Sequence, residues 1–268
     1  MCAEPAQVQP ACPRQGQTTG HKRNLKLVIA YNGAAYHGWQ RQAEDLDTVQ
    51  QRVEQAAAGV LRHPVSVFGA GRTDAGVHAC GQVANLHTPN HSVPLRGLRR
   101  AMNARLPGDI AVRSACEVPP DFHASRCARG KTYRYRIWVS PVRPVGLHRL
   151  VYHYWRPLEI EPMRAAAARL VGRHDFRGFA TSAEDRQDTV REIFRCEVAP
   201  QDAELHVSVQ GDGFLYNMVR IIAGTLIEVG RGRWPPDRID RILASGDRRS
   251  AGPTLPPDGL YLMCVHYD

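Results

Sequence analysis

The sequence predicts an α+β protein of two domains, built on mainly antiparallel sheet with flanking helices. Strand-like and helix-like patterns occur in both halves of the chain, and two pairs of strand-like segments are spaced as hairpins. Two prolines, Pro119 and Pro120, interrupt the pattern between the halves. We therefore expect a disordered tail over residues 1–23, an N-terminal domain over 24–118 and a C-terminal domain over 119–268.

The N-terminal elements begin with Leu25–Tyr31 (LKLVIAY), which is typical of a buried strand. After a polar loop, Thr48 and Gln51 have the spacing of a capping box and predict a helix to about Leu61. Its expected apolar face comprises Val49, Val53, Ala56, Ala57 and Val60.

Residues 65–68 and 82–88 predict a hairpin around the glycine-rich turn 69–76. Next, Pro94 is expected to open a basic helix that precedes a strand over residues 110–118. The arginines expected in that helix, which could contact an RNA backbone or form a solvated charged face, are Arg96, Arg99, Arg100 and Arg105.

The C-terminal domain starts with Lys131–Val139 (KTYRYRIWV), whose alternation predicts a strand with one basic face. The segment 217–229 is apolar almost throughout and predicts a buried helix. The remaining predicted elements are helices over 162–171 and 235–244, a hairpin of 191–198 with 204–210, and a final strand over 259–267.

The composition is basic, with a formal net charge of +9 and a pI near 9.5. Only Lys22, Lys26 and Lys131 are lysines, so 35 − 3 = 32 of the basic residues are arginine. Arginine suits phosphate because its planar fork donates two hydrogen bonds at once. The composition favours nucleic-acid binding, although genomic base composition alone also enriches arginine.

Cysteine spacing and hydropathy restrict the remaining classes. The seven cysteines form no C-x-x-C pair, so neither a zinc site nor a redox pair is indicated. No apolar run approaches the roughly 18 residues that span a bilayer, and the N-terminus lacks a signal-peptide pattern. We therefore expect a cytoplasmic protein that binds no membrane and no metal.

The turn Gly69-Ala-Gly-Arg-Thr-Asp-Ala-Gly76 is the first candidate for chemistry. The dinucleotide-binding motif G-x-G-x-x-G requires glycine at the position of Asp74. The phosphate-binding loop motif requires Lys and then Ser or Thr at the positions of Val77 and His78. What remains is a carboxylate, Asp74, at a hairpin end with Arg72 two residues away. The alternative is an Asp that merely bonds nearby backbone in the turn.

Arg220 and Glu228 are the only charged residues from Phe214 to Val229. A buried arginine needs an anionic partner, and Asp74 is the best candidate because flanking glycines allow close approach. Alternatively, the aliphatic part of the Arg220 side chain is buried and its guanidinium reaches solvent. On the basic strand, Tyr133 is either a packed core residue or a platform on which a base stacks.

These residues together resemble the tRNA pseudouridine synthase A family. The matching segments are Tyr31-Asn-Gly-x-x-Tyr-x-Gly-Trp-Gln-x-Gln42, Gly71-Arg-Thr-Asp-Ala-Gly-Val-His-Ala79, Gln82-Val-Ala84, Lys131-Thr-Tyr-Arg-Tyr135, Gly213-Phe-Leu-x-Asn-Met-Val-Arg220 and Gly259-Leu-Tyr-Leu262. The resemblance departs at Asn32, where the family usually has Asp, and at Ser125-Arg126, where Arg and an aromatic are usual.

The resemblance implies the pseudouridine synthase fold, with an active-site cleft between the domains. It implies Asp74 as the catalytic nucleophile, Arg220 as its partner, Tyr133 as an aromatic contacting the target base, and Arg72 as an aid to base extraction. It further implies a homodimer that acts without cofactor on uridines of the tRNA anticodon stem-loop, at tRNA positions 38–40.

The carboxylate could add to the sugar C1′, add to the base C6, or assist elimination at the sugar. Two other classes remain open on the residues alone. A non-catalytic RNA-binding module would share the charge and the aromatics but would not need Asp74. A hydrolase could use Asp74 as an aspartyl nucleophile, although no separate base or metal cluster has suitable spacing.

Overall fold

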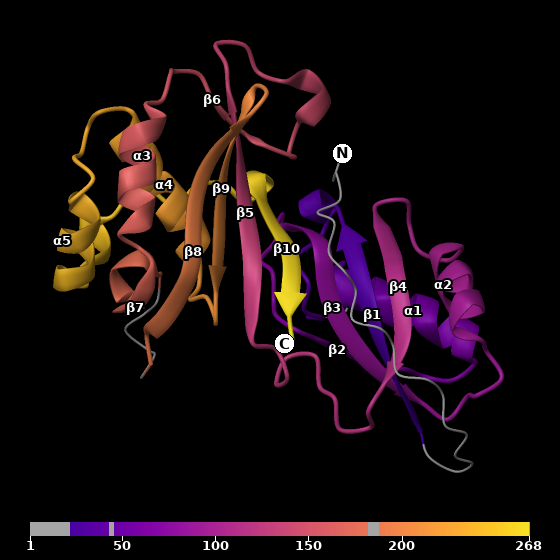
Figure 1. Ribbon diagram of the computed structural model, residues 1–268. Helices are drawn as coiled ribbons and strands as arrows, with labels where there is room; N and C mark the ends of the chain where they lie inside the picture. Colours follow the sequence, from indigo (N-terminus) through magenta and orange to yellow (C-terminus); the bar gives the residue numbers. More distant parts are fainter. Residues whose placement is uncertain (1–21, 43–45, 182–187, 268) are drawn as a thin grey trace. The chain divides into compact units, whose positions relative to one another are not determined.

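The computed structural model describes residues 22–42, 46–181 and 188–267, and its elements confirm the predicted α+β class (Figure 1). The chain divides into two compact units. The first runs to Ala128 and includes Tyr267, and the second runs from Arg129 to His266. The division into units follows from which residues contact one another. The domain ranges expected from the sequence remain predictions. Of the predicted tail, residues 1–21 lie outside the described residues.

The first unit combines antiparallel strands with two helices. Strand β1 pairs with both β3 and β4, and β2 pairs with β3, which confirms the predicted hairpin. The elements are β1 (Arg23–Tyr31), α1 (Val49–Leu61), β2 (Val67–Gly69), β3 (His78–Thr88), α2 (Leu95–Asn103) and β4 (Ile110–Val118).

Local chemistry explains both helices of this unit. The Gln51 amide donates to the Thr48 hydroxyl at the start of α1, as the capping box predicts. On α2, Leu98 and Met102 lie one turn apart and are buried. The prediction that Arg105 belongs to this helix is wrong: α2 ends at Asn103, because Pro107 cannot continue a helix.

The core of the first unit lies between its sheet and these helices. In β1, Leu25, Leu27 and Ile29 alternate along the strand and are fully buried. Because α2 packs against β4 and α1, Leu98 and Met102 extend the same core. This core fixes β1, which ends at Tyr31, and β3, which follows the glycine-rich turn.

The second unit contains a larger mainly antiparallel sheet, in the order β10-β5-β9-β8-β7, with β6 parallel to β5. Its elements are β5 (Gly130–Val139), β6 (Tyr152–Tyr154), α3 (Ile160–Ala168), β7 (Gly172–Asp175), β8 (Val190–Gln201), β9 (Glu204–Gly211), α4 (Met218–Gly230), α5 (Arg238–Ser245) and β10 (Leu260–His266).

Helix α4 is buried on nearly every side, as its apolar sequence predicts. It packs against α3, and α3 also contacts β8 (Figure 1). The β8–β9 hairpin is confirmed as well. Within the part of the chain that the structure describes, no helix is both long and apolar enough to cross a bilayer.

Candidate active site

The Asp74 turn is held by the strands on both of its sides. The Ala70 amide donates to the Val83 carbonyl at 2.7 Å, and the Gln82 side chain donates to the Gly71 carbonyl at 2.8 Å. At the far end, the Val77 amide donates to the Asp74 carbonyl at 3.1 Å. The backbone that carries Asp74 is therefore constrained at both ends.

The segment after β1 packs directly against this turn. The Trp39 amide donates to the Thr73 carbonyl at 3.0 Å. Gly38 has φ +91°, and a Cβ there would lie 2.5 Å from the Thr73 carbonyl oxygen. A Cβ on Gly33 would lie 1.9 Å from the Val77 carbonyl oxygen. Only glycine permits these approaches, so two segments far apart in sequence form one rigid unit.

Thr73 connects the turn to the core. Its hydroxyl shares a 2.8 Å hydrogen bond with the phenol of Tyr31, a side chain only 4% exposed. Burial raises the pKa of Tyr31 well above its ordinary value, so the phenol stays protonated. The residue that immediately precedes Asp74 is thus anchored by a neutral, buried bond.

Asp74 and Arg72 differ in exposure although only Thr73 separates them. Arg72 is exposed, Thr73 is buried and Asp74 is half-buried. The turn therefore offers one carboxylate and one guanidinium at a hairpin end, as the sequence predicts.

Tyr133 lies in the centre of β5, between Val209 of β9 and Leu262 of β10. Its side chain is only 8% exposed, and its ring meets Phe214 edge to face at a centroid distance of 5.1 Å. The buried ring fits the interpretation of a packed core residue, and its use as a platform for a base stays a prediction.

Arg220 is held by neutral oxygens of its own unit. Its Nε donates to the Leu255 carbonyl at 2.6 Å, and its Nη1 donates to Asn217 Oδ1 at 2.6 Å. Asn217 in turn donates to the Thr181 hydroxyl at 2.9 Å. Arg220 is half-buried, and these bonds fix its direction. Its positive charge also lies close enough to Tyr135 to act on that phenol electrostatically.

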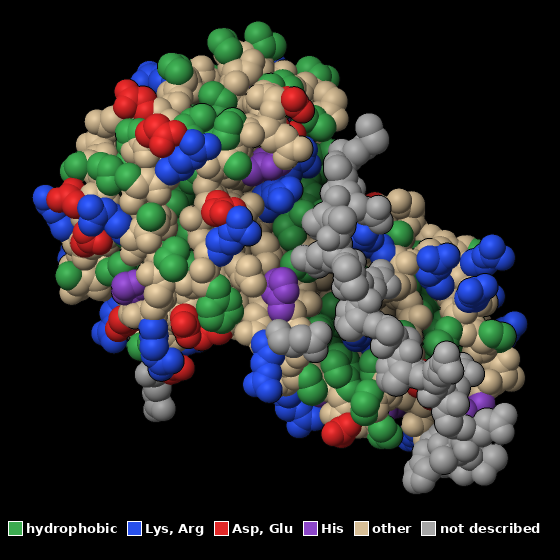
Figure 2. All heavy atoms as spheres, viewed as in Figure 1, with side chains coloured by type: hydrophobic (Ala, Val, Ile, Leu, Met, Phe, Trp, Pro, Cys, Tyr) green, Lys and Arg blue, Asp and Glu red, His purple; other side chains and the backbone are tan. Residues whose placement is uncertain are grey.

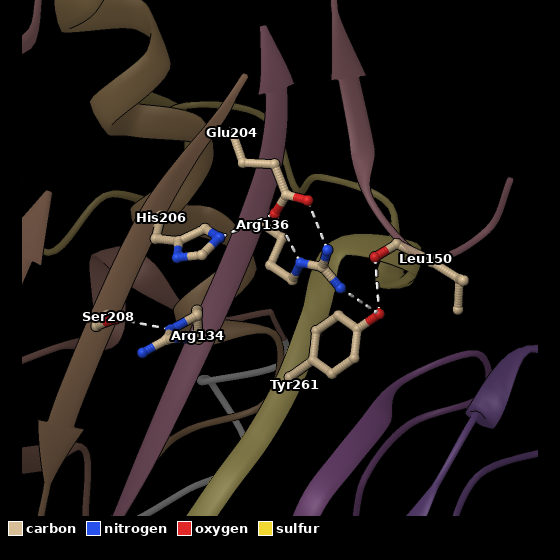
Figure 3. A network of polar contacts seen from close by, with 7 residues as sticks. All are labelled: Arg134, Arg136, Leu150, Glu204, His206, Ser208 and Tyr261. Carbon is tan, nitrogen blue, oxygen red and sulfur yellow. Dashed lines mark hydrogen bonds and ion pairs between the residues drawn. The ribbon is translucent and has the colours of Figure 1, made fainter. Parts of the chain in front are cut away.

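The basic face predicted for β5 carries Arg134 and Arg136, and a carboxylate offsets the charge of Arg136. Arg136 donates to both carboxylate oxygens of Glu204, at 2.7 and 2.6 Å, and its other nitrogen donates to the Tyr261 hydroxyl (Figure 3). His206 also bonds Glu204, at 2.9 Å, and Arg134 donates to Ser208. Strand β9 supplies Glu204, His206 and Ser208, and β10 supplies Tyr261, so this face of β5 is a structural network.

Exposed basic side chains instead gather on α2, where Figure 2 shows a group of Lys and Arg side chains. Arg99 donates to the Arg113 carbonyl at 3.2 Å. Among the described residues, no carboxylate lies within ion-pair distance of the three exposed arginines of the α2 surface, Arg96, Arg99 and Arg100. Their charge is therefore available to a phosphate backbone.

The four candidate residues thus fall into two pairs. The first unit carries Asp74 and Arg72 in one turn, and the second carries Tyr133 and Arg220. Sequence reasoning missed the residues that hold them, chiefly Tyr31, Gly38 and Asn217. The signal was present, because all three lie inside the segments that carry the resemblance. In the described part of the chain, no cluster of three or more His, Cys, Asp or Glu side chains suits a metal ion.

Comparison with known proteins identifies the family. A family model described as tRNA pseudouridine synthase matches residues 27–125 and 166–268. The chain is 48% identical to tRNA pseudouridine synthase A of Syntrophotalea carbinolica, over 91% of this chain and 96% of that protein. It is 47% identical to the protein of that name from Citrifermentans bemidjiense, over 91% and 98% of the two chains, and 44% identical to that from Acetivibrio thermocellus, over 91% and 100%.

The fold and these matches define an RNA-modifying isomerase. The chain belongs to the tRNA pseudouridine synthase family, whose members convert uridine to pseudouridine. Membership sets aside the two alternatives from the sequence, a non-catalytic RNA-binding module and a hydrolase.

Proposed function

We propose that this enzyme isomerises adjacent uridines of the tRNA anticodon stem-loop, with Asp74 as its nucleophile. The names of its relatives and its basic composition support tRNA as the substrate. The choice of the anticodon stem-loop rests on the resemblance of the sequence to the family. The observation that carries the choice of Asp74 is the rigid turn, which holds a half-buried carboxylate between the Tyr31–Thr73 bond and the Val77–Asp74 bond. Catalysis by a positioned group requires such fixed geometry.

The reaction conserves every atom of the nucleotide. The bond between N1 of uracil and C1′ breaks, the uracil rotates, and C5 forms a new bond to C1′. The C5 proton is then lost, and N1 ends with a proton. No oxidant or cosubstrate is consumed, so the protein itself must supply the nucleophile, orient the uracil and move a proton. The carboxylate of Asp74 acts at C1′, at C6, or in elimination at the sugar; each route demands an ionised side chain.

Arg220 is proposed to pair with Asp74 and keep that carboxylate ionised, because a nearby positive charge favours the charged form. Its bonds to Leu255 and Asn217 support this role, since they fix the direction of the guanidinium. An Arg220→Lys variant keeps the charge but cannot make both bonds. We expect its kcat to fall at least tenfold, and an unchanged kcat would remove the role.

Tyr133 is proposed to contact the target uracil and retain it while it rotates. Its edge-to-face packing on Phe214 supports this role, since a ring held from one side presents a defined surface on the other. Its hydroxyl is proposed to relay the C5 proton. A Tyr133→Phe enzyme that turns over as fast as the wild type would rule out the proton relay and leave the stacking role intact.

Arg72 is proposed to help extract the target nucleotide. A uridine must leave its stack before a side chain can reach it, at a cost of a few kcal/mol. The exposed Arg72 guanidinium can fill the vacated space or hold the neighbouring phosphates. Its position two residues from Asp74 couples base extraction to the nucleophile.

RNA contacts outside the turn are proposed to come from the α2 surface. Arg96, Arg99 and Arg100 are exposed and, among the described residues, lack a carboxylate within ion-pair distance. Recognition of tRNA shape through backbone contacts is typical of enzymes that accept several adjacent uridines. We further propose that the enzyme works as a homodimer in the cytoplasm.

The proposed function is tested with an unmodified tRNA transcript carrying tritium at C5 of uracil. We expect the purified enzyme to release tritium, and chemical mapping to place the modified nucleotides in the anticodon stem-loop. Tritium release together with modification elsewhere in the tRNA would support the isomerase activity but overturn the anticodon stem-loop as its target. Tritium that stays bound to the RNA would overturn the proposed function.

A further inference from the structure

A pocket of about 530 Å³ lies in the first unit beside β2. Gln40, Arg41, Glu54, Phe68 and His123 are among the residues that line it. Its volume falls within the roughly 300–1,000 Å³ of small-molecule sites. None of these residues has a part in the proposed chemistry, although Gln40 and Gln42 lie in the first segment that resembles the family.

An exposed aromatic ring forms one wall of this pocket. Phe68 is 43% exposed, and the ring of His123 lies 5.5 Å from it, centroid to centroid. A phenyl ring left open to solvent beside polar side chains is the kind of surface on which nucleobases stack. Phe68 also immediately precedes Gly69, where the Asp74 turn begins.

The strand that carries Phe68 is fixed before any ligand binds. On the outer side of β2, the Val67 amide donates to Glu54 at 3.0 Å, and Gln50 donates to the Val67 carbonyl at 2.9 Å. These α1 side chains replace a neighbouring strand, and Phe68 pairs with Asn85 of β3 on the other side. A rigid wall loses little entropy when a ligand binds.

The charges in the pocket favour a neutral ligand over a phosphate. Among the described residues, Glu54 is the only carboxylate that lines the pocket, and its side chain is 11% exposed. The Arg41 guanidinium lies 3.4 Å from that carboxylate and offsets its charge. Burial lowers the pKa of His123, with Arg126 and His87 adding to the effect, so the imidazole is neutral at pH 7. A base edge matches this mixture of donors and acceptors, whereas a phosphate would face the carboxylate.

We propose that this pocket binds a nucleobase of the RNA substrate, stacked on Phe68, at a position near the uridine that reacts. The polar side chains Gln40 and Arg41 contact the edge of that base. The pocket thereby holds a second nucleotide while the target uridine is extracted, and it sets where the RNA lies along the Asp74 turn. The inference rests on the proposed function, because it takes RNA as the substrate.

The first experiment compares Phe68→Ala with Phe68→Tyr, which retains the ring. Phe194→Ala is the matched control, because Phe194 is 44% exposed and lies in the second unit. Tritium release from C5-labelled tRNA gives kcat and KM for each variant. We expect Phe68→Ala to raise KM about 5- to 100-fold with kcat within about threefold of the wild type. Phe68→Tyr and Phe194→Ala should keep the wild-type KM.

A second experiment separates stacking from a structural role. Stem-loop RNAs with one base removed at each position are titrated, by fluorescence anisotropy, against enzymes that carry Asp74→Asn. We expect one abasic position to weaken binding by the enzyme with Phe68 but not by its Phe68→Ala derivative, because the lost base has no ring to stack on. Additive effects at every position would overturn the proposal.

Other outcomes are equally decisive. A Phe68→Ala enzyme with wild-type KM and melting temperature would overturn the pocket assignment and leave the isomerase intact. A wild-type enzyme that releases no tritium would overturn the proposed function, and the anisotropy titrations would still test the pocket on their own.

Discussion

Tyr31 and Thr73 share a buried hydrogen bond of 2.8 Å, which ties the last residue of β1 to the residue before Asp74. We expect Thr73→Val to destabilise the protein by about 1 kcal/mol and to lower kcat about tenfold, since the turn loses an anchor. Urea denaturation and tritium release measure the two effects.

Tyr31→Phe should cost at least as much, since the Tyr31 hydroxyl also interacts with Gln82. The double variant should be no worse than Tyr31→Phe, because Thr73→Val removes a bond that Tyr31→Phe already lacks. Thr132→Val is the control, since it removes a hydroxyl bond of the same length to His266 in the second unit. A Thr73→Val enzyme with unchanged kcat would show that the bond does not position the turn.

The second prediction concerns Gly38, whose backbone has φ +91° and lies against the Thr73 carbonyl. Gly38→Ala would force a Cβ to within 2.5 Å of that oxygen, so the turn must shift. We expect kcat to fall at least tenfold. Gly108→Ala is the control, because a Cβ there meets nothing within 4 Å. Equal activity of the two variants would contradict the role of the close approach.

The third prediction concerns the α2 surface. Replacing Arg96, Arg99 and Arg100 with glutamine should weaken tRNA binding and reduce the slope of log affinity against log salt by up to about three. The controls are three arginines that already pair with carboxylates, Arg195, Arg241 and Arg249. Binding is measured by filter retention over a range of salt concentrations. An unchanged slope in the α2 variant would place the RNA elsewhere.

The fourth prediction is a pH effect from the Arg136–Glu204 pair. Burial alone would raise the pKa of Glu204, but bonds from Arg136 and His206 lower it below its ordinary value of 4.5. A lowered pKa in the folded state means that the pair stabilises the fold at neutral pH and loses this effect as pH falls through that pKa.

Glu204→Gln should therefore cost about 2 kcal/mol of unfolding free energy at pH 7 and progressively less below pH 4.5. The exposed pair of Arg164 and Glu161 supplies the control, since Glu161→Gln should change stability by under about 0.5 kcal/mol. Urea denaturation at several pH values measures both. A pH-independent difference for Glu204→Gln would contradict the pair's contribution.

Local sequence patterns predicted most elements correctly because their causes are local. Thr48 caps α1. The apolar residues of α4 leave that helix no polar face to expose to solvent. The helix predicted to include Arg105 ends at Asn103, because Pro107 restricts the conformation of the residue before it. Asp74 and Arg220 are candidates from the sequence because a charge in an apolar or glycine-rich setting is conspicuous there.

Long-range contacts could not be predicted in the same way. The alternation of residues 131–139 predicts a basic face that includes Arg136, but it does not indicate that Glu204, in a strand more than sixty residues away, offsets that charge. Likewise, nothing near Gly38 in the sequence indicates that Thr73 lies against it. Such contacts depend on strand register and loop packing, which a single sequence does not specify.

The central claim is that Asp74 is the nucleophile, and single-turnover tritium release by Asp74→Asn tests it most directly. Asp121→Asn, which alters an exposed carboxylate of the same unit, is the matched control. We predict that Asp74→Asn binds tRNA and melts like the wild type but releases tritium at least about 1,000-fold more slowly, because an amide cannot act as the nucleophile. Release within about tenfold of the wild-type rate would contradict the claim.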